Sequence, residues 1–200
     1  MFNFKANGKS EPETLDQKDP ASGKIAAIHH GGKVSRALLK KAVIFANKAF
    51  PSDYAVSVET ALSWIAKDPT SVLIALDQAG SVAAYASIFR LSRETYFDIV
   101  RGDLCDWDIS DLGPMKKDGS LASYFYVGAV VVREDLRGSA AFKVMREAIM
   151  GQIKTAAAGD ETFVACEILS EPARRAVEKM GLLKVKDALD GFPLYAGRIL

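Results

Sequence analysis

The sequence predicts a single α/β domain whose central sheet is mixed, mostly antiparallel and flanked by helices. Along the chain, short apolar runs typical of strands alternate with longer runs of helical periodicity, in the order β–α–α–β–β–α–β–α–β–α–β–β. Hydrophobic residues make up 49% of the 200 residues, which is enough for one large core. The 26 basic and 25 acidic residues nearly balance, as expected for a soluble domain.

The chain is expected to divide into a flexible leader, residues 1–22, and one domain, residues 23–200. The leader is polar, is punctuated by Gly, Ser and Pro, and lacks the apolar core of a signal peptide, so we expect a cytoplasmic protein. No apolar run approaches the length of a membrane-spanning helix, so no membrane partner is expected. The near-neutral total charge argues against nucleic acid as a partner.

Cysteine and histidine usage predicts no metal site. Cys105 and Cys166 belong to no C-x-x-C motif or Cys/His cluster, which argues against zinc and against a disulfide framework. Cys166 lies in an apolar strand and is predicted to be a small core residue rather than a nucleophile. His29 and His30 are adjacent in a strand and point to opposite faces, so they make a poor pair of metal ligands.

The first half of the domain should contain a strand, two helices and an antiparallel hairpin. These elements are expected at residues 24–30, 34–50, 57–68, 71–77 and 81–91. Pro51 should close the first helix, and Ser57 can cap the second. The predicted face of the first helix comprises Val34, Leu38, Lys41, Ile44 or Phe45, and Ala49. The predicted face of the second comprises Thr60, Ala61, Trp64 and Ile65.

The second half should contain a short helix, a long loop, a strong strand and then alternating helices and strands. Residues 92–101 begin as a helix and lead into an acidic, Gly- and Pro-broken loop that reaches residue 121. The remaining elements are expected at residues 122–132, 141–158, 162–169, 170–180, 182–189 and 191–200, and Ser170 can cap the helix at 170–180.

The acidic loop allows two interpretations. A long irregular segment in a compact domain is often functional, and this one could border a cationic substrate, with Trp107 as its apolar anchor. The alternative is a flexible surface loop without function. The aspartates at 103, 106, 108 and 111 lack the spacing of a calcium loop and favour a solvated segment.

The stretch VVVREDLRGSAAFKVM, residues 130–145, passes from a strand into a helix. A helix start offers unpaired backbone N–H donors and partial positive charge, so an anion can bind there. Small residues such as Gly138, Ser139 and Ala140 would let a phosphate approach the backbone. A plain strand–turn–helix connection is the other interpretation of so short a pattern.

Three stretches together resemble the GCN5-related N-acetyltransferase family. They are VLIALDQAGSVAAYASI, VVVREDLRGSAAFKVM and EILSEPARRAVEKMGLLKV, and the likeness extends over residues 34–200. The resemblance implies an acyl-CoA N-acyltransferase fold, with the acyl-CoA pyrophosphate held on backbone amides after Arg137. The cofactor-binding residues that it implies are Val130, Val131, Val132, Arg137, Gly138, Ser139, Ala140, Ala141, Phe142, Ser170 and Ala173.

The resemblance further implies transfer of an acetyl group from acetyl-CoA to an amine by direct attack. Candidates for the acid and base are Tyr126, Tyr124 and Glu167, on the two strands that the family splays around the thioester. The alternative is that the tyrosines only pack and that Glu167 pairs with Arg174 or Arg175.

The chain departs from the family pattern at the cofactor loop and at the usual general acid. Ala140 stands where the family usually has Gly, and Phe142 stands where it usually has Gly or Ala. Val177 stands where the family often has the tyrosine that protonates the CoA thiolate. These departures favour a rival hypothesis, a catalytically degenerate binding or regulatory module of the same fold. The acceptor stays open among small amines, antibiotics, aminoacyl-tRNA and protein amines, as does formation of a homo-oligomer.

Overall fold

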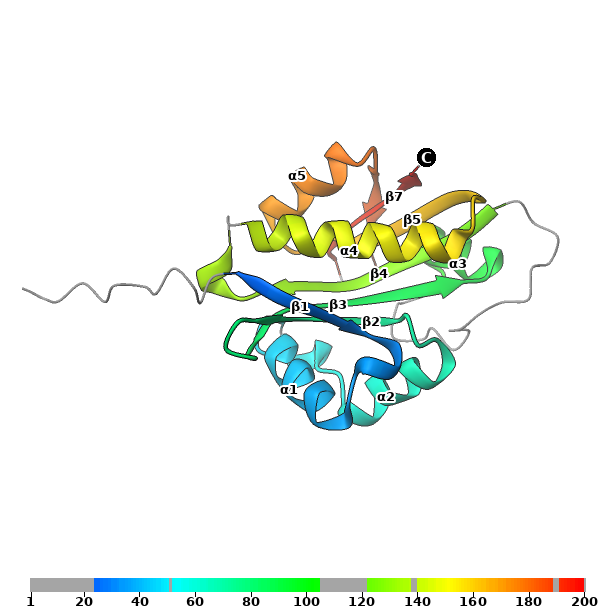
Figure 1. Ribbon diagram of the computed structural model, residues 1–200. Helices are drawn as coiled ribbons and strands as arrows, with labels where there is room; N and C mark the ends of the chain where they lie inside the picture. Colours follow the sequence, from blue (N-terminus) through cyan, green and yellow to red (C-terminus); the bar gives the residue numbers. More distant parts are fainter. Residues whose placement is uncertain (1–23, 51, 105–121, 138–139, 189–190, 200) are drawn as a thin grey trace, which may run out of the picture.

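The computed structural model describes residues 24–50, 52–104, 122–137, 140–188 and 191–199 (Figure 1). The predicted leader, most of the acidic loop with Cys105 and Trp107, and Gly138 with Ser139 therefore lie outside the described residues.

A seven-stranded mixed sheet forms the centre of the molecule, in the order β1-β2-β3-β4-β5-β7-β6. The strands are β1 (Ile25–His30), β2 (Val72–Asp77), β3 (Val82–Leu91), β4 (Ala122–Val132), β5 (Glu161–Glu167), β6 (Leu183–Asp187) and β7 (Pro193–Arg198). The β4–β5 pair is parallel, and the other paired strands are antiparallel. The predicted fold class, order of elements and β2–β3 hairpin are thus confirmed.

In the part of the chain that the structure describes, five α-helices cover the two faces of this sheet. They are α1 (Arg36–Asn47), α2 (Val58–Lys67), α3 (Arg93–Arg101), α4 (Ala140–Ala157) and α5 (Glu171–Lys179). Helices α4 and α5 lie on one face, and α1 and α2 lie on the other (Figure 1). Helix α3 packs on the α1–α2 face, because its Tyr96 and Ile99 join a cluster that Trp64 of α2 also contacts.

A serine begins four of these helices. The side chains of Ser35, Ser57, Ser92 and Ser170 each accept a hydrogen bond from the backbone N–H three residues further on. Such a cap satisfies a donor that the helix itself leaves unpaired, which stabilises the helix by about 1 kcal/mol. The helix starts are therefore determined locally, and the caps predicted at Ser57 and Ser170 are confirmed.

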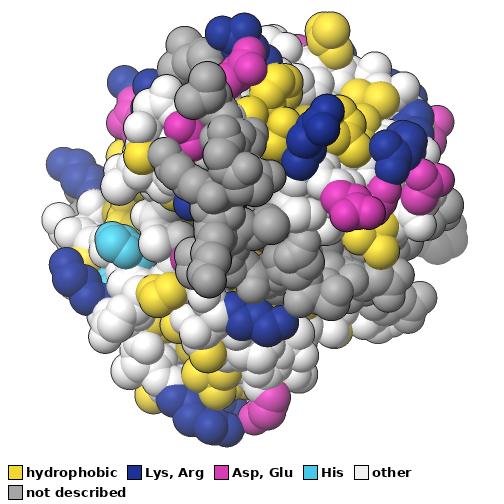
Figure 2. Space-filling model, turned by 90° about the vertical axis from the view of Figure 1, so that its right-hand side faces the viewer, with side chains coloured by type: hydrophobic (Ala, Val, Ile, Leu, Met, Phe, Trp, Pro, Cys, Tyr) yellow, Lys and Arg dark blue, Asp and Glu magenta, His cyan; other side chains and the backbone are white. Residues whose placement is uncertain are grey.

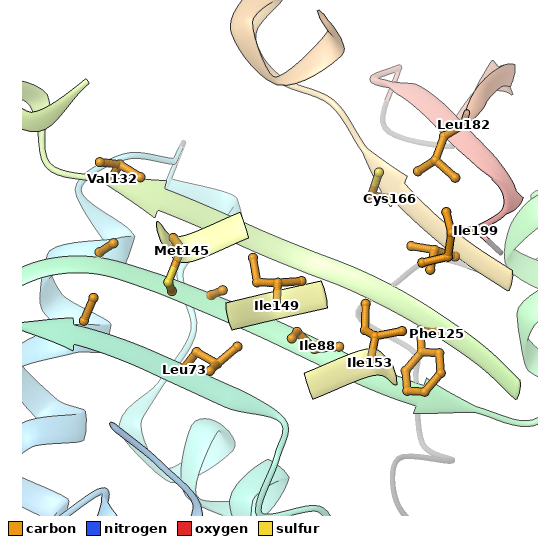
Figure 3. Close-up of a cluster of buried hydrophobic side chains, with 14 of the residues drawn as sticks. Leu73, Ile88, Phe125, Val132, Met145, Ile149, Ile153, Cys166, Leu182 and Ile199 are labelled. Carbon is orange, nitrogen blue, oxygen red and sulfur yellow. The ribbon is translucent and has the colours of Figure 1, made fainter. Parts of the chain in front are cut away.

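Helix α4 supplies the centre of the core on its face of the sheet. Its Met145, Ile149 and Ile153 are buried against Leu73 of β2 and Phe125 of β4 (Figure 3). The 18-residue helix crosses the middle of the sheet, so its first residues come to lie beyond the end of β4.

The inward face of helix α1 coincides only in part with the predicted one, since Leu38 and Phe45 are partly buried against the core as predicted but other residues form its centre. Its buried residues are Leu39, Ala42, Val43 and Ala46. Lys41 is exposed, and Ile44 is 49% exposed. Apolar residues occur almost all round this helix, so periodicity identifies it without selecting its inward face.

Two further details of this region differ from the prediction. Helix α1 ends at Asn47, before Pro51, and the Asn47 side-chain amide exchanges two hydrogen bonds with the backbone of Val56. On α2, Thr60 is exposed rather than part of the packed face, and its hydroxyl lies 2.8 Å from the capping Ser57 hydroxyl. In both places a polar side chain makes a local hydrogen bond where the apolar periodicity predicted continued helix or a packed face.

Charged side chains of both signs are interspersed on the face of the molecule in Figure 2, with hydrophobic side chains between them. Among the described residues the exposed large hydrophobics are Ile44, Val130, Leu169, Leu183 and Val185. Val130 is unusual in this set because it belongs to β4, a central strand of the sheet.

Candidate active site

Strands β4 and β5 part halfway along β4. Their parallel ladder runs from Ala122 and Glu161 to Val127 and Cys166, whereas β4 continues to Val132. Beyond Cys166 the chain leaves β4 and leads to α5 (Figure 3). Among the described strands β4 pairs only with β3 and β5, so the second half of β4 has a strand on one side alone. Its backbone N–H and C=O groups on the β5 side can therefore bind a ligand.

A β-bulge at Gly128 marks the point where the strands part. The β3–β4 register shifts there, because Ile88 pairs with Val127 and Ser87 pairs with Ala129. A Cβ atom on Gly128 would lie 2.9 Å from the Phe89 ring and 3.2 Å from the Ser87 Oγ, so a larger residue would require the buried Phe89 ring to shift. The sequence prediction missed this residue, although a lone glycine inside an apolar strand is typical of a bulge.

Two exposed apolar side chains flank this opening between the strands. Val130 of β4 is 38% exposed, and Leu169, just beyond β5, is 41% exposed. Val131 and Val132 are buried, so of the three predicted valines only Val130 offers a side chain to a ligand. The other two can contribute backbone groups only.

The connection from β4 to α4 is held by a short 3₁₀ helix, Glu134–Leu136. Leu136 is buried in the core beneath α4. Arg137 follows it, is exposed, and has its Nε 3.5 Å from the Val132 carbonyl oxygen. The connection thus delivers an exposed guanidinium to a position just before the start of α4.

The first turn of α4 presents a small side chain outward. Ala140 is exposed, Ala141 is buried, and Phe142 is partly buried against the core. The bulky side chain that departs from the family pattern therefore packs against the core. The predicted residues Arg137, Ala140 and Ala141 lie together at the end of β4.

Helix α5 begins beside β5. Its Ser170 cap accepts from the Ala173 N–H at 3.4 Å, and Ala173 and Val177 pack against the core. Arg174 forms ion pairs with Glu171 and Glu178 of its own helix, and Arg175 forms one with Glu171. Hydrogen bonds from these arginines lower the pKa of the exposed Glu171 to about 2.

The three predicted acid–base residues share one face of the sheet. Tyr126 pairs with Ala165 of β5, both belong to the cluster beside α3, and Glu167 lies two residues beyond Ala165 on the same side. Glu167 is half-buried at the last position of β5. Tyr126 and Glu167 thus lie near the point where β4 and β5 part, whereas Tyr124 pairs with Phe163, four residues before Glu167 on β5.

Both candidate tyrosines belong to an aromatic cluster. Tyr126 is 0% exposed, and the Tyr124 ring stacks on Phe163 with 5.4 Å between centroids. The ring centroid of Tyr96, on α3, lies 5.2 Å from that of Tyr124. The Tyr96 hydroxyl donates a hydrogen bond to the Val164 carbonyl, and burial raises its pKa. Packing alone accounts for the burial of these rings, and their role in proton transfer stays a prediction.

Tyr126→Phe tests that role. If the Tyr126 hydroxyl protonates the leaving thiolate, kcat should fall by about tenfold to a hundredfold while CoA affinity stays the same. Steady-state kinetics with saturating acyl-CoA measure the change. Tyr85→Phe is the matched control, since Tyr85 is also a buried tyrosine but belongs to the α1–α2 cluster. Equal kcat in the wild type and Tyr126→Phe would leave water or the substrate as the proton donor.

Cys166 is a buried core thiol, as predicted. Burial raises its pKa to about 12, so it stays protonated at neutral pH and is a poor nucleophile. In the described part of the chain, no three His, Cys, Asp or Glu side chains are grouped so that they could hold a metal ion. Nor does any described helix have the length and apolarity needed to cross a membrane.

Comparison with known proteins identifies the fold. No family model and no curated protein matches the sequence. Many solved structures match instead, among them the loading GNATL domain of CurA from Lyngbya majuscula, with a TM-score of 0.65 and 11% identity over 86% of this chain and 97% of that one. The GphF GNAT-like decarboxylase in complex with isobutyryl-CoA has a TM-score of 0.60 and 11% identity over 87% of this chain and 100% of that one.

A GNAT-family acetyltransferase from Streptococcus pneumoniae has a TM-score of 0.55 and 12% identity, over 87% of this chain and 99% of that one. Each of these matches covers 86 or 87% of this chain. The chain has the fold of the GCN5-related N-acetyltransferases.

Proposed function

We propose that the protein is an acyl-CoA-dependent N-acyltransferase that moves an acetyl group from acetyl-CoA to an amine. The observation that carries this proposal is the parting of β4 and β5 after Val127 and Cys166, with β4 running on into Arg137 and the start of α4. One extended ligand can then place its acyl end beside β4 and its phosphates at the helix start.

The described residues suit acyl-CoA chemically. Among the described residues, Arg137 is an exposed guanidinium with no carboxylate partner, and it lies three positions before Ala140, the first residue of α4. Ala140 leaves room for a phosphate near the backbone. Val130 and Leu169 offer apolar surface to the uncharged arm that joins the phosphates to the thioester. The apolar surface of Val130 and Leu169 suits the apolar arm of such a ligand, and Arg137 with the start of α4 suits its phosphates.

The transfer needs little covalent help from the protein. The unprotonated amine attacks the thioester carbonyl, a C–N bond forms, the C–S bond breaks, and the thiolate takes up a proton. A backbone N–H on the freed part of β4 can hold the carbonyl oxygen as negative charge develops on it. Glu167 and the two tyrosines are the side chains that we propose for the proton transfers, since Tyr126 and Glu167 lie beside the point where the strands part and Tyr124 lies on the same face of β4.

Calorimetry with acetyl-CoA and with longer acyl-CoAs tests the binding step. Heat with at least one of them supports the proposal, whereas no heat with any would favour the rival binding or regulatory module. Phe142 and Val177 first raised that rival, yet both side chains pack against the core. Neither residue therefore demonstrates that the cofactor loop is blocked.

Turnover assays with panels of amines test the chemical step. Release of free CoA thiol should depend on the added amine, and the acylated amine should appear in equal amount. Because one matching structure is described as a GNAT-like decarboxylase, CO₂ release from carboxylated acyl-CoA is measured in parallel. We also propose a cytoplasmic location, where acyl-CoA is available.

A further inference from the structure

Asp77 at the end of β2 is a buried carboxylate, and both of its oxygens accept hydrogen bonds. Its Oδ1 accepts hydrogen bonds from the backbone N–H groups of Ala79 and Ser81, each at 2.9 Å, which closes the β2–β3 turn. Its Oδ2 accepts a 2.7 Å hydrogen bond from the guanidinium of Arg133. This hydrogen bond is the main cause of the lowered pKa of Asp77. The buried charge is therefore matched by one specific cation.

Arg133 is the first residue after β4, and it holds two carboxylates at once. Its Nη1 donates to Asp77, and its Nε donates to Asp135 at 2.7 Å. Its backbone N–H donates to the carbonyl of Ala83 on β3 at 2.9 Å. The arginine thus ties the β4–α4 connection to the β2–β3 turn, two segments that lie at the same end of the sheet (Figure 1).

We infer that Arg133 is a positioning residue for the acyl-CoA pyrophosphate, because its bridge to Asp77 and Asp135 holds the connection from which Arg137 and α4 start. This inference rests on the proposed function. Leu136 anchors the same connection from the other side by its burial in the core. The connection is therefore held at Arg133 and at Leu136, and Arg137 directly follows Leu136.

The two arginines of this connection have different tasks. Arg133 is only partly exposed, and its charge is matched by two carboxylates, so it is poorly placed to serve as a phosphate ligand. Arg137 is exposed and forms no ion pair with any described residue. Binding of an anion by backbone amides and a guanidinium depends on their relative positions to within about 1 Å. A looser connection should therefore weaken pyrophosphate binding without any loss of a direct ligand.

Arg133→Lys tests this role, because a lysine keeps the charge beside Asp77 but cannot span both carboxylates with a planar fork. Calorimetry should show the Kd for CoA raised by about tenfold. Glu134→Gln is the matched control, since it removes an exposed neighbouring carboxylate that has no described partner. Its CoA affinity should equal that of the wild type. Asp135→Asn is a second variant, which loosens one side of the bridge and should weaken CoA binding in the same direction.

A substrate without the pyrophosphate separates positioning from general destabilisation. The kcat/KM of Arg133→Lys should fall with acetyl-CoA but stay at the wild-type value with S-acetylpantetheine, which lacks that group. Equal losses with both substrates would overturn the inference. So would wild-type CoA affinity in the two bridge variants.

The double variant Asp77→Asn, Arg133→Gln tests whether Arg133 positions the connection or only neutralises the buried Asp77 carboxylate. The double variant removes both charges of the pair, so no buried carboxylate is left unmatched. CoA binding should stay weak if the bridge positions the connection, and recovery to wild-type affinity would overturn the inference. A wild-type protein that binds no acyl-CoA would instead reject the proposed function itself.

Discussion

Ala140→Trp should abolish acyl-CoA binding in a protein that still folds. Ala140 is the first residue of α4 and is exposed, so an indole there would cover the backbone amides at the helix start without disturbing the core. We expect the Kd for CoA to rise at least about a hundredfold, equivalent to about 2.8 kcal/mol. Calorimetry measures the affinity, and circular dichroism with thermal unfolding verifies the fold.

Thr155→Trp is the matched control for this variant. Thr155 is exposed near the other end of the same helix, so the substitution adds the same side chain far from the proposed phosphate site. Its CoA affinity should equal that of the wild type. A folded Ala140→Trp variant with unchanged CoA affinity would remove the phosphate assignment at the start of α4.

Leu39→Ala should destabilise the protein by about 2–5 kcal/mol, the range for truncation of a buried leucine. Leu39 is fully buried on α1, in a cluster with Val72, Ile74 and Tyr85 of the sheet. The substitution leaves a cavity that the neighbouring side chains can fill only in part. Urea unfolding, followed by circular dichroism, gives the free energy of unfolding.

Ile44→Ala is the control that distinguishes the two faces of α1. Ile44 is one of the two alternatives predicted at this position of the face, the other being Phe45, and it is 49% exposed, so its truncation should change the free energy of unfolding by no more than about 0.5 kcal/mol. Both substitutions end in alanine, so helix propensity contributes little to the difference. A larger loss for Ile44→Ala than for Leu39→Ala would mean that α1 packs with the other face inward.

The order of helices and strands could be predicted because it depends on short-range patterns. Strand β4 was expected at residues 122–132 and occupies Ala122–Val132, since its run of β-branched and aromatic residues has no competing helical period. Ser57 and Ser170 marked helix starts correctly because a cap acts on an N–H only three residues away.

The candidate site could be predicted only in part. Arg137 and Ala140 were identified from the loop, and the structure places them at the end of β4. The bulge at Gly128 had a local signal, a glycine inside an apolar strand, but its consequence depends on Phe89 and Ser87 of the neighbouring strand. The roles of Tyr124, Tyr126 and Glu167 as acid and base stay a prediction, and the burial of the two tyrosines depends on the packing of α3 in the same cluster.

The sequence by itself determined the elements, their order and the small-residue loop before α4, because each depends on residues within a few positions of one another. The tertiary structure alone decided which face of α1 is buried, where β4 and β5 part, and how Asp77 meets Arg133. Those two residues are 56 positions apart in the chain, and a charge pair carries no periodicity that would relate them. Each is an ordinary charged residue in its own segment, and only the paired β3 and β4 strands bring them into contact.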